Sequence, residues 1–341
     1  MSSPVRFAIL GAGIFVKEEH LPAVLASPNS ELKAIYSRSI KSVKAVLEGA
    51  TISSKVDTYS DDSGSGKGLD DLLARKDIDA VIVALPIPIQ PTIIKKSLDA
   101  GKHVLSEKPI AKDIAAAKEL ISYAKGVKTG ALWGVAENFR YYPTWTKAVE
   151  YREKLGKPLS FRLQMGGFVK PGDKYYETSW RKVPDYQGGF LLDGGVHFIA
   201  GLRKLLGDNK ITTVSAFSRL NYDYLAPVDT VNGVGVTEDG TTGTITMSFA
   251  DIKGGYDNTV QYQNGYVSVT PSKAEIVIDG KQVDSVEYTG NGVHEEVDAF
   301  AKGIHAGKLD AAQAPEEALS DLQIVEELLE SAKAGGAPRK L

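Results

Sequence analysis

The sequence predicts an α/β protein in two parts: an N-terminal doubly wound parallel sheet, and a C-terminal α+β domain with a large, mostly antiparallel open sheet. Over the first 140 residues, short apolar runs alternate strictly with stretches of helical spacing, which is typical of βαβ units. These runs are almost continuously apolar, as expected for strands covered on both faces. After about residue 156, β-rich segments follow one another. We therefore expect one domain over residues 1–140 and another over residues 141–341.

The elements of the first domain are read from these alternating patterns. The expected strands are residues 5–11, 31–37, 79–86, 103–109 and 130–138. The expected helices, several of them closed by glycine, are residues 20–27, 39–49, 69–75, 91–101 and 113–125. Residues 61–68, DDSGSGKG, are expected to form a flexible loop, because their glycines lack the spacing of a phosphate loop.

The second domain is expected to be mainly antiparallel, because its β-rich segments are punctuated by Gly, Asn and Asp. These segments are residues 160–169, 211–222, 230–237, 243–250, 258–265, 265–271, 274–280 and 284–290. One helical stretch, residues 191–207, interrupts them, and a second covers residues 294–307. The last helix, residues 314–334 approximately, begins with proline and paired acids, and we expect it to return toward the first domain.

Composition excludes several classes of protein. A net charge of −3 provides no general attraction for nucleic acid. The longest apolar runs are far shorter than the ~20 residues of a membrane-spanning helix. The chain has no cysteine, so it has neither disulfides nor thiolate metal sites, and its five histidines are scattered with no metal-ligand spacing. We therefore expect a cytoplasmic enzyme with no metal.

A glycine-rich turn follows the first strand and predicts a dinucleotide site of the Rossmann type. In GAGIFV, Gly11 permits the tight turn and Gly13 allows backbone amides to approach a pyrophosphate. The third position of the G-x-G-x-x-G pattern is Val16, so the next helix should lie slightly farther from the strand. The motif alone is weak, but its place at the first strand of a βαβ series strengthens it.

The end of the second strand indicates which dinucleotide binds. A site specific for NAD has Asp or Glu about 20 residues past the motif, whereas this stretch reads Tyr-Ser-Arg-Ser from Tyr36. The guanidinium of Arg38 can pair with a 2′-phosphate while Ser37 donates a hydroxyl. NADP(H) is therefore favoured over NAD(H). The alternative is that Arg38 is a solvated loop residue.

Lys108, in the stretch GKHVLSEKPIAK, follows the carboxyl end of a predicted strand, where ligands of doubly wound sheets bind. Its ammonium could bind a substrate oxygen that gains negative charge during hydride transfer. Pro109 fixes the backbone beside it. Taken alone, a lysine after a strand is more often a surface charge.

A second candidate group is the pair Asp193 and His197 in GGFLLDGGVHFIAG. Four residues apart on a helix, the two side chains would share one face, and the carboxylate could orient the imidazole as an acid/base. Gly194 and Gly195 between them would permit close approach of a cofactor ring or substrate. The alternative is the start of a helix with an incidental salt bridge.

Taken together, GAGIFV, AGKHVLSEKP, ENFRYYP and GGFLLDGGVH resemble the glucose-fructose oxidoreductase, inositol dehydrogenase and MocA (Gfo/Idh/MocA) family, and within it the fungal NADP(H)-dependent oxidoreductases. The resemblance covers essentially the whole chain. It implies that Lys108 contacts substrate and nicotinamide, that Asp193 is the substrate-site acid, and that His197 transfers the proton. The Lys-Pro bond of this family is often cis.

The resemblance and the motifs together give the expected site. The catalytic residues are Lys108, Asp193 and His197, and with Arg140 they are also expected to bind substrate. The residues expected at the cofactor are Gly11, Gly13, Ile14, Phe15, Ser37, Arg38, Leu85, Pro86, Glu107, Lys108, Asn138, Trp180 and Arg181. The chain departs from the family pattern at two positions: Ala200 stands where many members have an acid, and the position near Gln90 lacks the histidine that many have. Both changes alter the polarity of the pocket, so we do not assign to this chain the substrate of better-known members.

The expected function is reversible hydride transfer between NADP(H) and a carbinol or carbonyl carbon of a small polyol, aldose or diol. Two alternatives stay open: a reductase or dihydrodiol-type dehydrogenase acting on a nonsugar carbonyl, and a regulator that binds NADP without catalysis. Alternation of apolar and polar residues in GTITMSFA and ITTVSAFS suggests a partly apolar open face on the second sheet. A homodimer through that sheet is expected.

Overall fold

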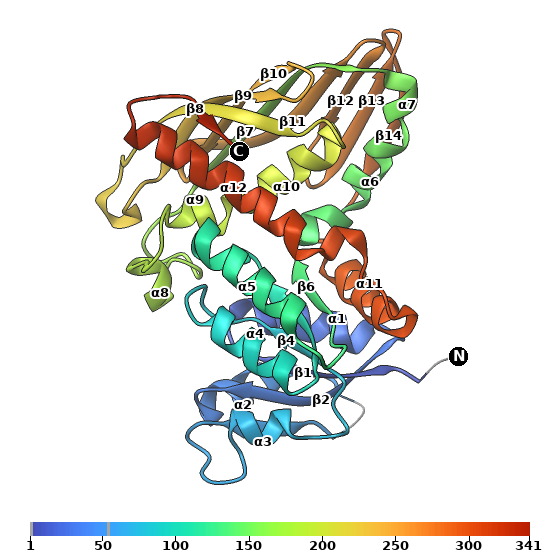
Figure 1. Ribbon diagram of the computed structural model, residues 1–341, viewed down its shortest axis with the longest axis vertical. Coiled ribbons are helices and arrows are strands. Elements are labelled where there is room, and N and C mark those ends of the chain that lie inside the picture. The colour runs from blue at the N-terminus through green and yellow to red at the C-terminus, as the bar shows by residue number, and fades with distance from the viewer. Residues whose placement is uncertain (1–2, 53–54) are drawn as a thin grey trace. The chain divides into compact units, whose positions relative to one another are not determined.

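The computed structural model describes residues 3–52 and 55–341. The chain divides into two compact units (Figure 1). The first unit consists of Met1–Glu137 and Val293–Ala318, and the second of Asn138–Gly292 and Leu319–Leu341.

The first unit contains a six-stranded parallel sheet in the order β3-β2-β1-β4-β5-β6. Its strands are β1 (Val5–Leu10), β2 (Ser30–Ser37), β3 (Asp57–Ser60), β4 (Ala80–Val83), β5 (His103–Glu107) and β6 (Trp133–Ala136). This is the doubly wound Rossmann order, in which the direction of winding reverses between β1 and β4. The predicted fold of the first domain is confirmed. β3 was not among the expected strands, because only the last two of its four residues are buried and the segment DTYS has no apolar run.

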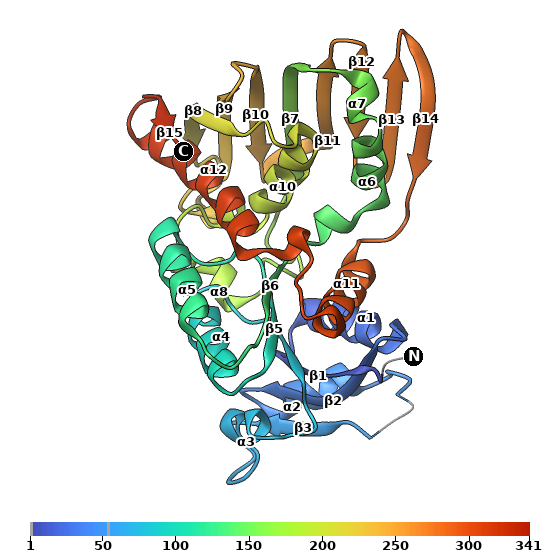
Figure 2. The same ribbon diagram turned by 45° about the vertical axis from the view of Figure 1, so that its right-hand side comes forward.

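Helices cover both faces of this sheet. They are η1 (Val16–His20), α1 (Leu21–Ala26), α2 (Ile40–Leu47), α3 (Leu69–Leu73), α4 (Gln90–Asp99), α5 (Ile114–Gly126), α11 (Val293–Ala306) and η4 (Ala311–Gln313). Figure 2 shows α4 and α5 on one side of the sheet and α1 and α11 on the other. Residues 61–68 form neither helix nor strand, as expected.

The segment that joins the first unit from the end of the chain is α11 rather than the last helix as a whole. Val297 and Phe300 of α11 belong to the same buried core as Phe7 and Ile9 of β1, and the rings of Phe7 and Phe300 lie 6.4 Å apart. Burial of such side chains stabilises a fold by about 1.5–3 kcal/mol each. The segment Val293–Ala318 therefore belongs to the first unit, which the sequence did not indicate, because an apolar helix face in a sequence does not identify the sheet that it covers.

The second unit contains a nine-stranded sheet in the order β14-β13-β12-β11-β7-β10-β9-β8-β15, drawn side by side in Figure 2. Its strands are β7 (Pro158–Phe168), β8 (Ile211–Arg219), β9 (Thr230–Thr237), β10 (Thr242–Ser248), β11 (Ala250–Tyr262), β12 (Gly265–Val269), β13 (Lys273–Ile278), β14 (Lys281–Glu287) and β15 (Arg339–Lys340). All pairs are antiparallel except β10 with β7. The expected large, mostly antiparallel sheet is confirmed.

The helical segments of the second unit are short, apart from α10 and the part of α12 beyond residue 318. They are η2 (Asn138–Tyr141), α6 (Pro143–Glu150), α7 (Arg152–Leu155), α8 (Ser179–Lys182), α9 (Phe190–Asp193), α10 (Gly195–Leu206), η3 (Asp223–Leu225) and α12 (Pro315–Lys333). On the sheet, α10 packs on β7 and β11, and α6 packs on β12 and β13. Leu328 of α12 covers Gly233 of β9.

The two faces of this sheet differ in polarity. Ile245 and Met247 of β10 are fully buried on the face under the helices. The alternate residues of β10 on the opposite face are Thr242, Thr244, Thr246 and Ser248. The expectation of a partly apolar open face is wrong for this strand, because its apolar residues all face the helices. Exposed apolar side chains occur instead on neighbouring strands, at Val234 (50% exposed) and Phe217 (65% exposed).

Among residues 3–52 and 55–341, no helix is both long enough and apolar enough to cross a membrane.

Candidate functional site

The turn after β1 requires glycine at Gly11. Its φ is +137°, and a Cβ there would lie 2.2 Å from the carbonyl oxygen of Ala84. The N–H of Gly11 donates to the carbonyl oxygen of Tyr36 at 2.8 Å, which ties the turn to β2. A Cβ at Gly13 would meet nothing within 4 Å. This open space beside the backbone fits the pyrophosphate of a dinucleotide.

The helical segment after the turn includes a π-helical turn, η1, which passes into α1. Val16, at the third position of the glycine motif, is 1% exposed and lies in the core with Val24 and Phe7. A π turn is wider than an α turn, so the helix is widened from the residue that replaces a small one. Phe15 packs against the same core.

Ser37 and Arg38 lie at the carboxyl end of β2, beside the glycine turn. In the parallel ladders, Leu10 of β1 lies opposite Tyr36 of β2 on one side and opposite Val83 of β4 on the other. The expected cofactor residues that follow these three strands therefore share one edge of the sheet, the edge where ligands of this fold bind. They are Gly11, Gly13, Ile14, Phe15, Ser37, Arg38, Leu85 and Pro86.

Two acids that the sequence reading missed lie at the same edge, after β3. The hydroxyl of Tyr36 donates to Oδ1 of Asp61 at 2.7 Å, and burial together with this contact raises the pKa of Tyr36. Asp62 accepts from the hydroxyl of Ser60 and from the N–H of Ile40 at the start of α2, and both contacts lower the pKa of Asp62. These carboxylates come from a neighbouring strand, so the spacing from the glycine motif gave no signal for them.

Lys108 follows β5, next to β4 in the same sheet. The side chain is half-buried, and the Lys108–Pro109 peptide bond is cis. The preceding residue, Glu107, places Oε1 2.7 Å from Nε2 of His20, which is completely buried in η1. The glycine turn and Lys108 thus follow strands β1 and β5 at one edge of the sheet, with only β4 between them.

Asp193 lies in the second unit and is held by an arginine. Nε of Arg181 donates to Oδ2 of Asp193 at 2.6 Å. The guanidinium carbon of Arg181 lies 3.9 Å from the ring centre of Trp180 and 5.2 Å from that of Tyr175. Asp193 is only 6% exposed, so Arg181 supplies the positive charge that a buried carboxylate needs.

His197 lies at the start of α10 and stacks on Phe139, with ring centres 4.7 Å apart and planes inclined by 16°. The helix is interrupted between the two candidate residues: α9 ends at Asp193, α10 begins at Gly195, and the N–H of His197 donates to the carbonyl of Gly194. The expected continuous helix over residues 191–207 is therefore two helices.

The glycines between Asp193 and His197 serve packing inside the second unit. A Cβ at Gly194 would lie 2.6 Å from the ring of Phe249, and one at Gly195 would lie 3.3 Å from the sulfur of Met247. The expectation that they make room for a cofactor ring or substrate is corrected by these contacts, because side chains at the end of β10 fill the space that a Cβ would need.

Arg140 is part of a buried charge network. Its Nη2 donates to Oδ2 of Asp321, and Nη1 of Arg203 donates to the other oxygen of the same carboxylate at 2.6 Å. The side chains of Arg140 and Asp321 are 6% and 2% exposed. The nearby Asn138 donates through Nδ2 to the carbonyl oxygen of Asn291 at 2.6 Å. Both expected ligand residues thus make contacts that hold the second unit together.

The expected site residues fall into two groups. Those up to Lys108 belong to the first unit, and Asn138, Arg140, Trp180, Arg181, Asp193 and His197 belong to the second. Within the described ranges, no group of three or more acidic or histidine side chains could hold a metal ion.

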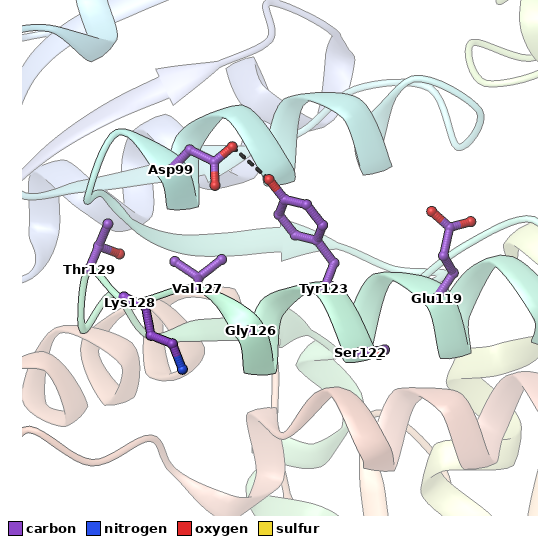
Figure 3. A pocket seen from close by; sticks show the side chains of 8 residues that line it. All are labelled: Asp99, Glu119, Ser122, Tyr123, Gly126, Val127, Lys128 and Thr129. Carbon is purple, nitrogen blue, oxygen red and sulfur yellow. Dashed lines mark hydrogen bonds between the residues drawn. The ribbon is translucent and has the colours of Figure 1, made fainter.

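A surface concavity of about 710 Å³ lies elsewhere in the first unit (Figure 3). It is lined by the end of α4, by α5 and by the loop after α5, and the hydroxyl of Tyr123 donates there to Asp99 at 2.6 Å. Because α4 and α5 end where β5 and β6 begin, this concavity lies at the opposite edge of the sheet from the glycine turn.

Comparison with known proteins identifies two domains of one family. Residues 5–133 match the model described as "Oxidoreductase family, NAD-binding Rossmann fold", and residues 151–341 match "Oxidoreductase family, C-terminal alpha/beta domain". The chain is 40% identical over 346 residues to the dehydrogenase FPY6 of Fusarium mangiferae, covering 98% of each chain. It is 28% identical to a D-xylose 1-dehydrogenase (NADP(+)) of Haloferax volcanii, covering 98% of this chain and 99% of the relative. The crystal structure of an oxidoreductase from Thermotoga maritima superimposes with a TM-score of 0.86 at 29% identity, covering 99% and 98% of the two chains.

Proposed function

The chain belongs to the Gfo/Idh/MocA oxidoreductase family, and on this premise we propose that it transfers hydride between NADP(H) and a carbinol or carbonyl carbon of a small polyol, aldose or diol. One observation carries the proposal: the glycine turn after β1 and Lys108 after β5 share the carboxyl edge of one parallel sheet. In such sheets this edge binds both the dinucleotide and the group that reacts with it.

The preference for NADP(H) rests on the end of β2. Arg38 is exposed there with Ser37 before it, so its guanidinium is available to a 2′-phosphate. Asp61 and Asp62 lie at the same edge but are engaged by Tyr36 and by the start of α2. In NAD-specific sites an acid holds a ribose hydroxyl. Here both of these carboxylates already make contacts within the protein.

The nicotinamide, when bound, supplies the hydride acceptor or donor, and side chains of this protein handle charge and protons. Lys108 binds the substrate oxygen and stabilises the negative charge that develops on it. His197 takes the hydroxyl proton in oxidation and returns it in reduction. Asp193, with its orientation fixed by Arg181, accepts a hydrogen bond from a substrate hydroxyl. The retention of these three residues favours an enzyme over an NADP-sensing regulator.

We also infer a homodimer and a cytoplasmic location. Val234 and Phe217, exposed on adjacent strands of the nine-stranded sheet, are candidates for an interface. Light scattering of the wild type and of a Val234→Lys variant tests the dimer, which the charged side chain should weaken.

The experiment that tests the proposed function follows nicotinamide absorbance during incubation with aldoses including D-xylose, polyols, diols and nonsugar carbonyls. Each compound is supplied with NADP+ or NADPH and, in parallel, with NAD+ or NADH. Turnover of a hydroxylated compound with NADP(H) is expected. Turnover confined to nonsugar carbonyls would favour the reductase alternative, and cofactor binding without any turnover would favour the regulator.

A further inference from the structure

Tyr186 lies in the segment between α8 and α9 and is 9% exposed. The backbone on its C-terminal side is fixed by two contacts. The side-chain amide of Gln187 donates to Glu326 of α12, and a Cβ at Gly188 would lie 2.9 Å from Leu329 of the same helix. The position of Tyr186 is therefore set by the packing of the second unit rather than by a mobile loop.

The hydroxyl of Tyr186 has no hydrogen-bond partner among the residues that the structure describes. Two other buried tyrosines, Tyr262 and Tyr36, differ in this respect. The hydroxyl of Tyr262 donates to the carbonyl oxygen of Leu205 at 2.9 Å, and that of Tyr36 donates to Asp61. Tyr186 is therefore a donor that folding of the second unit leaves unused.

The surroundings of Tyr186 are those of the proposed substrate acid. Its ring lies 6.0 Å from that of Trp180, over which the guanidinium of Arg181 stacks, and Arg181 in turn holds Asp193. Burial and the negative charge of Asp193 raise the pKa of Tyr186. The phenol therefore stays protonated, and remains a donor, around neutral pH.

We propose that Tyr186 is a specificity-determining residue whose phenol donates a hydrogen bond to a hydroxyl oxygen of the substrate, beside the hydroxyl that donates to Asp193. This inference rests on the proposed function and narrows its substrate class. A neutral donor next to a fixed carboxylate suits a molecule with two neighbouring hydroxyl groups, one accepting and one donating. A site built to bond a hydroxyl binds analogues that lack it less tightly, because its polar group then has no partner on the ligand. Polyols and aldoses are thus favoured over simple nonsugar carbonyls.

The test compares Tyr186→Phe with the wild type and with a matched control, Tyr262→Phe, which also removes a buried phenol from the second unit. D-Xylose, xylitol and glycerol serve as probes, with binding measured calorimetrically in the presence of NADP+ and turnover by absorbance. For Tyr186→Phe we expect KM and the dissociation constant of the best probe to rise about tenfold or more, as for a lost hydrogen bond of ordinary strength. The melting temperature should stay unchanged for Tyr186→Phe and fall by about 1–3 °C for Tyr262→Phe, which loses a bond within the protein.

The outcomes separate this inference from the proposed function. If the wild type turns over a probe and Tyr186→Phe has the same KM, the role of Tyr186 is overturned while the enzyme proposal stands. If no probe is turned over but one binds and Tyr186→Phe weakens that binding, the inference stands and the proposed reaction fails. If no probe binds the wild type, the inference is overturned. A melting temperature of Tyr186→Phe lowered as much as that of the control, with unchanged binding, would show a purely structural role.

Discussion

Nε2 of His20 lies 2.7 Å from Oε1 of Glu107, and this contact joins the helical segment after the glycine turn to the residue before Lys108. His20 is fully buried, and the side chain of Glu107 is 14% exposed. We predict that His20→Leu lowers the free energy of unfolding by about 2–3 kcal/mol, because the carboxylate loses its donor. Denaturant titration measures the loss. The control His305→Leu, at an exposed position of the same unit, should change stability by less than about 0.5 kcal/mol. Equal losses in both variants would contradict a special role for the pair.

A neutral substitution at Lys108 should separate catalysis from cofactor binding. For Lys108→Met we expect kcat to fall by about 10²–10³-fold, as when a group that stabilises a developing oxyanion is removed. The dissociation constant of NADP+ should stay nearly unchanged, because the pyrophosphate and ribose are held elsewhere. Steady-state kinetics and cofactor titration measure the two effects. Lys118→Met, on the exposed side of α5, is the matched control. Undiminished turnover in Lys108→Met would refute the role assigned to the lysine.

Arg38 should determine the choice between the two dinucleotides. We predict that Arg38→Ala raises KM for NADP(H) by about 10–100-fold, the effect of losing a hydrogen-bonded ion pair with a phosphate, and leaves KM for NAD(H) almost unchanged. The ratio of kcat/KM for the two cofactors is the measurement, with Lys44→Ala on α2 as control. An identical ratio in wild type and Arg38→Ala would place the arginine outside the cofactor site.

Periodicity predicted the fold because the strands that build both sheets are local apolar patterns. β4 reads Ala-Val-Ile-Val and is wholly buried, so one window of sequence suffices to recognise it. β3 and α6 were not predicted, because their sequences lack such a clear local pattern. The first is short and polar, and the second, PTWTKAVE, mixes β-branched and aromatic residues with few strong helix formers, although Pro143 stands at the preferred first position.

The candidate site was predicted less completely, because much of its geometry depends on contacts between distant segments. Asp62 reaches the start of α2 from the loop after β3, 22 residues away. Asp321 lies 181 residues from Arg140. No spacing rule relates such positions, so the motifs gave no signal for the carboxylate that Arg140 contacts.

Asp321 therefore provides a test of the charge network. Asp321→Ala would leave the guanidinium groups of Arg140 and Arg203 without the carboxylate that they share, and the free energy of unfolding should fall by about 3–5 kcal/mol. Denaturant unfolding followed by tryptophan fluorescence measures the change. Asp208→Ala, at an exposed position of the same unit, is the control. If Asp321→Ala were as stable as the control, the network would contribute nothing to folding.

His103, at the start of β5, should make the stability of the protein sensitive to acid. Its Nδ1 accepts a hydrogen bond from the N–H of Leu132 at 3.0 Å, and burial lowers its pKa from the ordinary value near 6.5, although the charge of Asp79 opposes this shift. As the pH falls, the unfolded chain therefore binds the proton before the folded protein does. The free energy of unfolding should then decrease from about pH 7 downward, through the pKa of His103 in the folded protein.

In His103→Asn, an amide oxygen can take the place of Nδ1 of His103 without titrating. We predict a smaller loss of stability between about pH 7.5 and pH 5 for His103→Asn than for the wild type or for the control His294→Asn, which alters an exposed histidine. Denaturant titrations at the two pH values provide the measurement, and equal losses in all three proteins would show that another group governs the acid response.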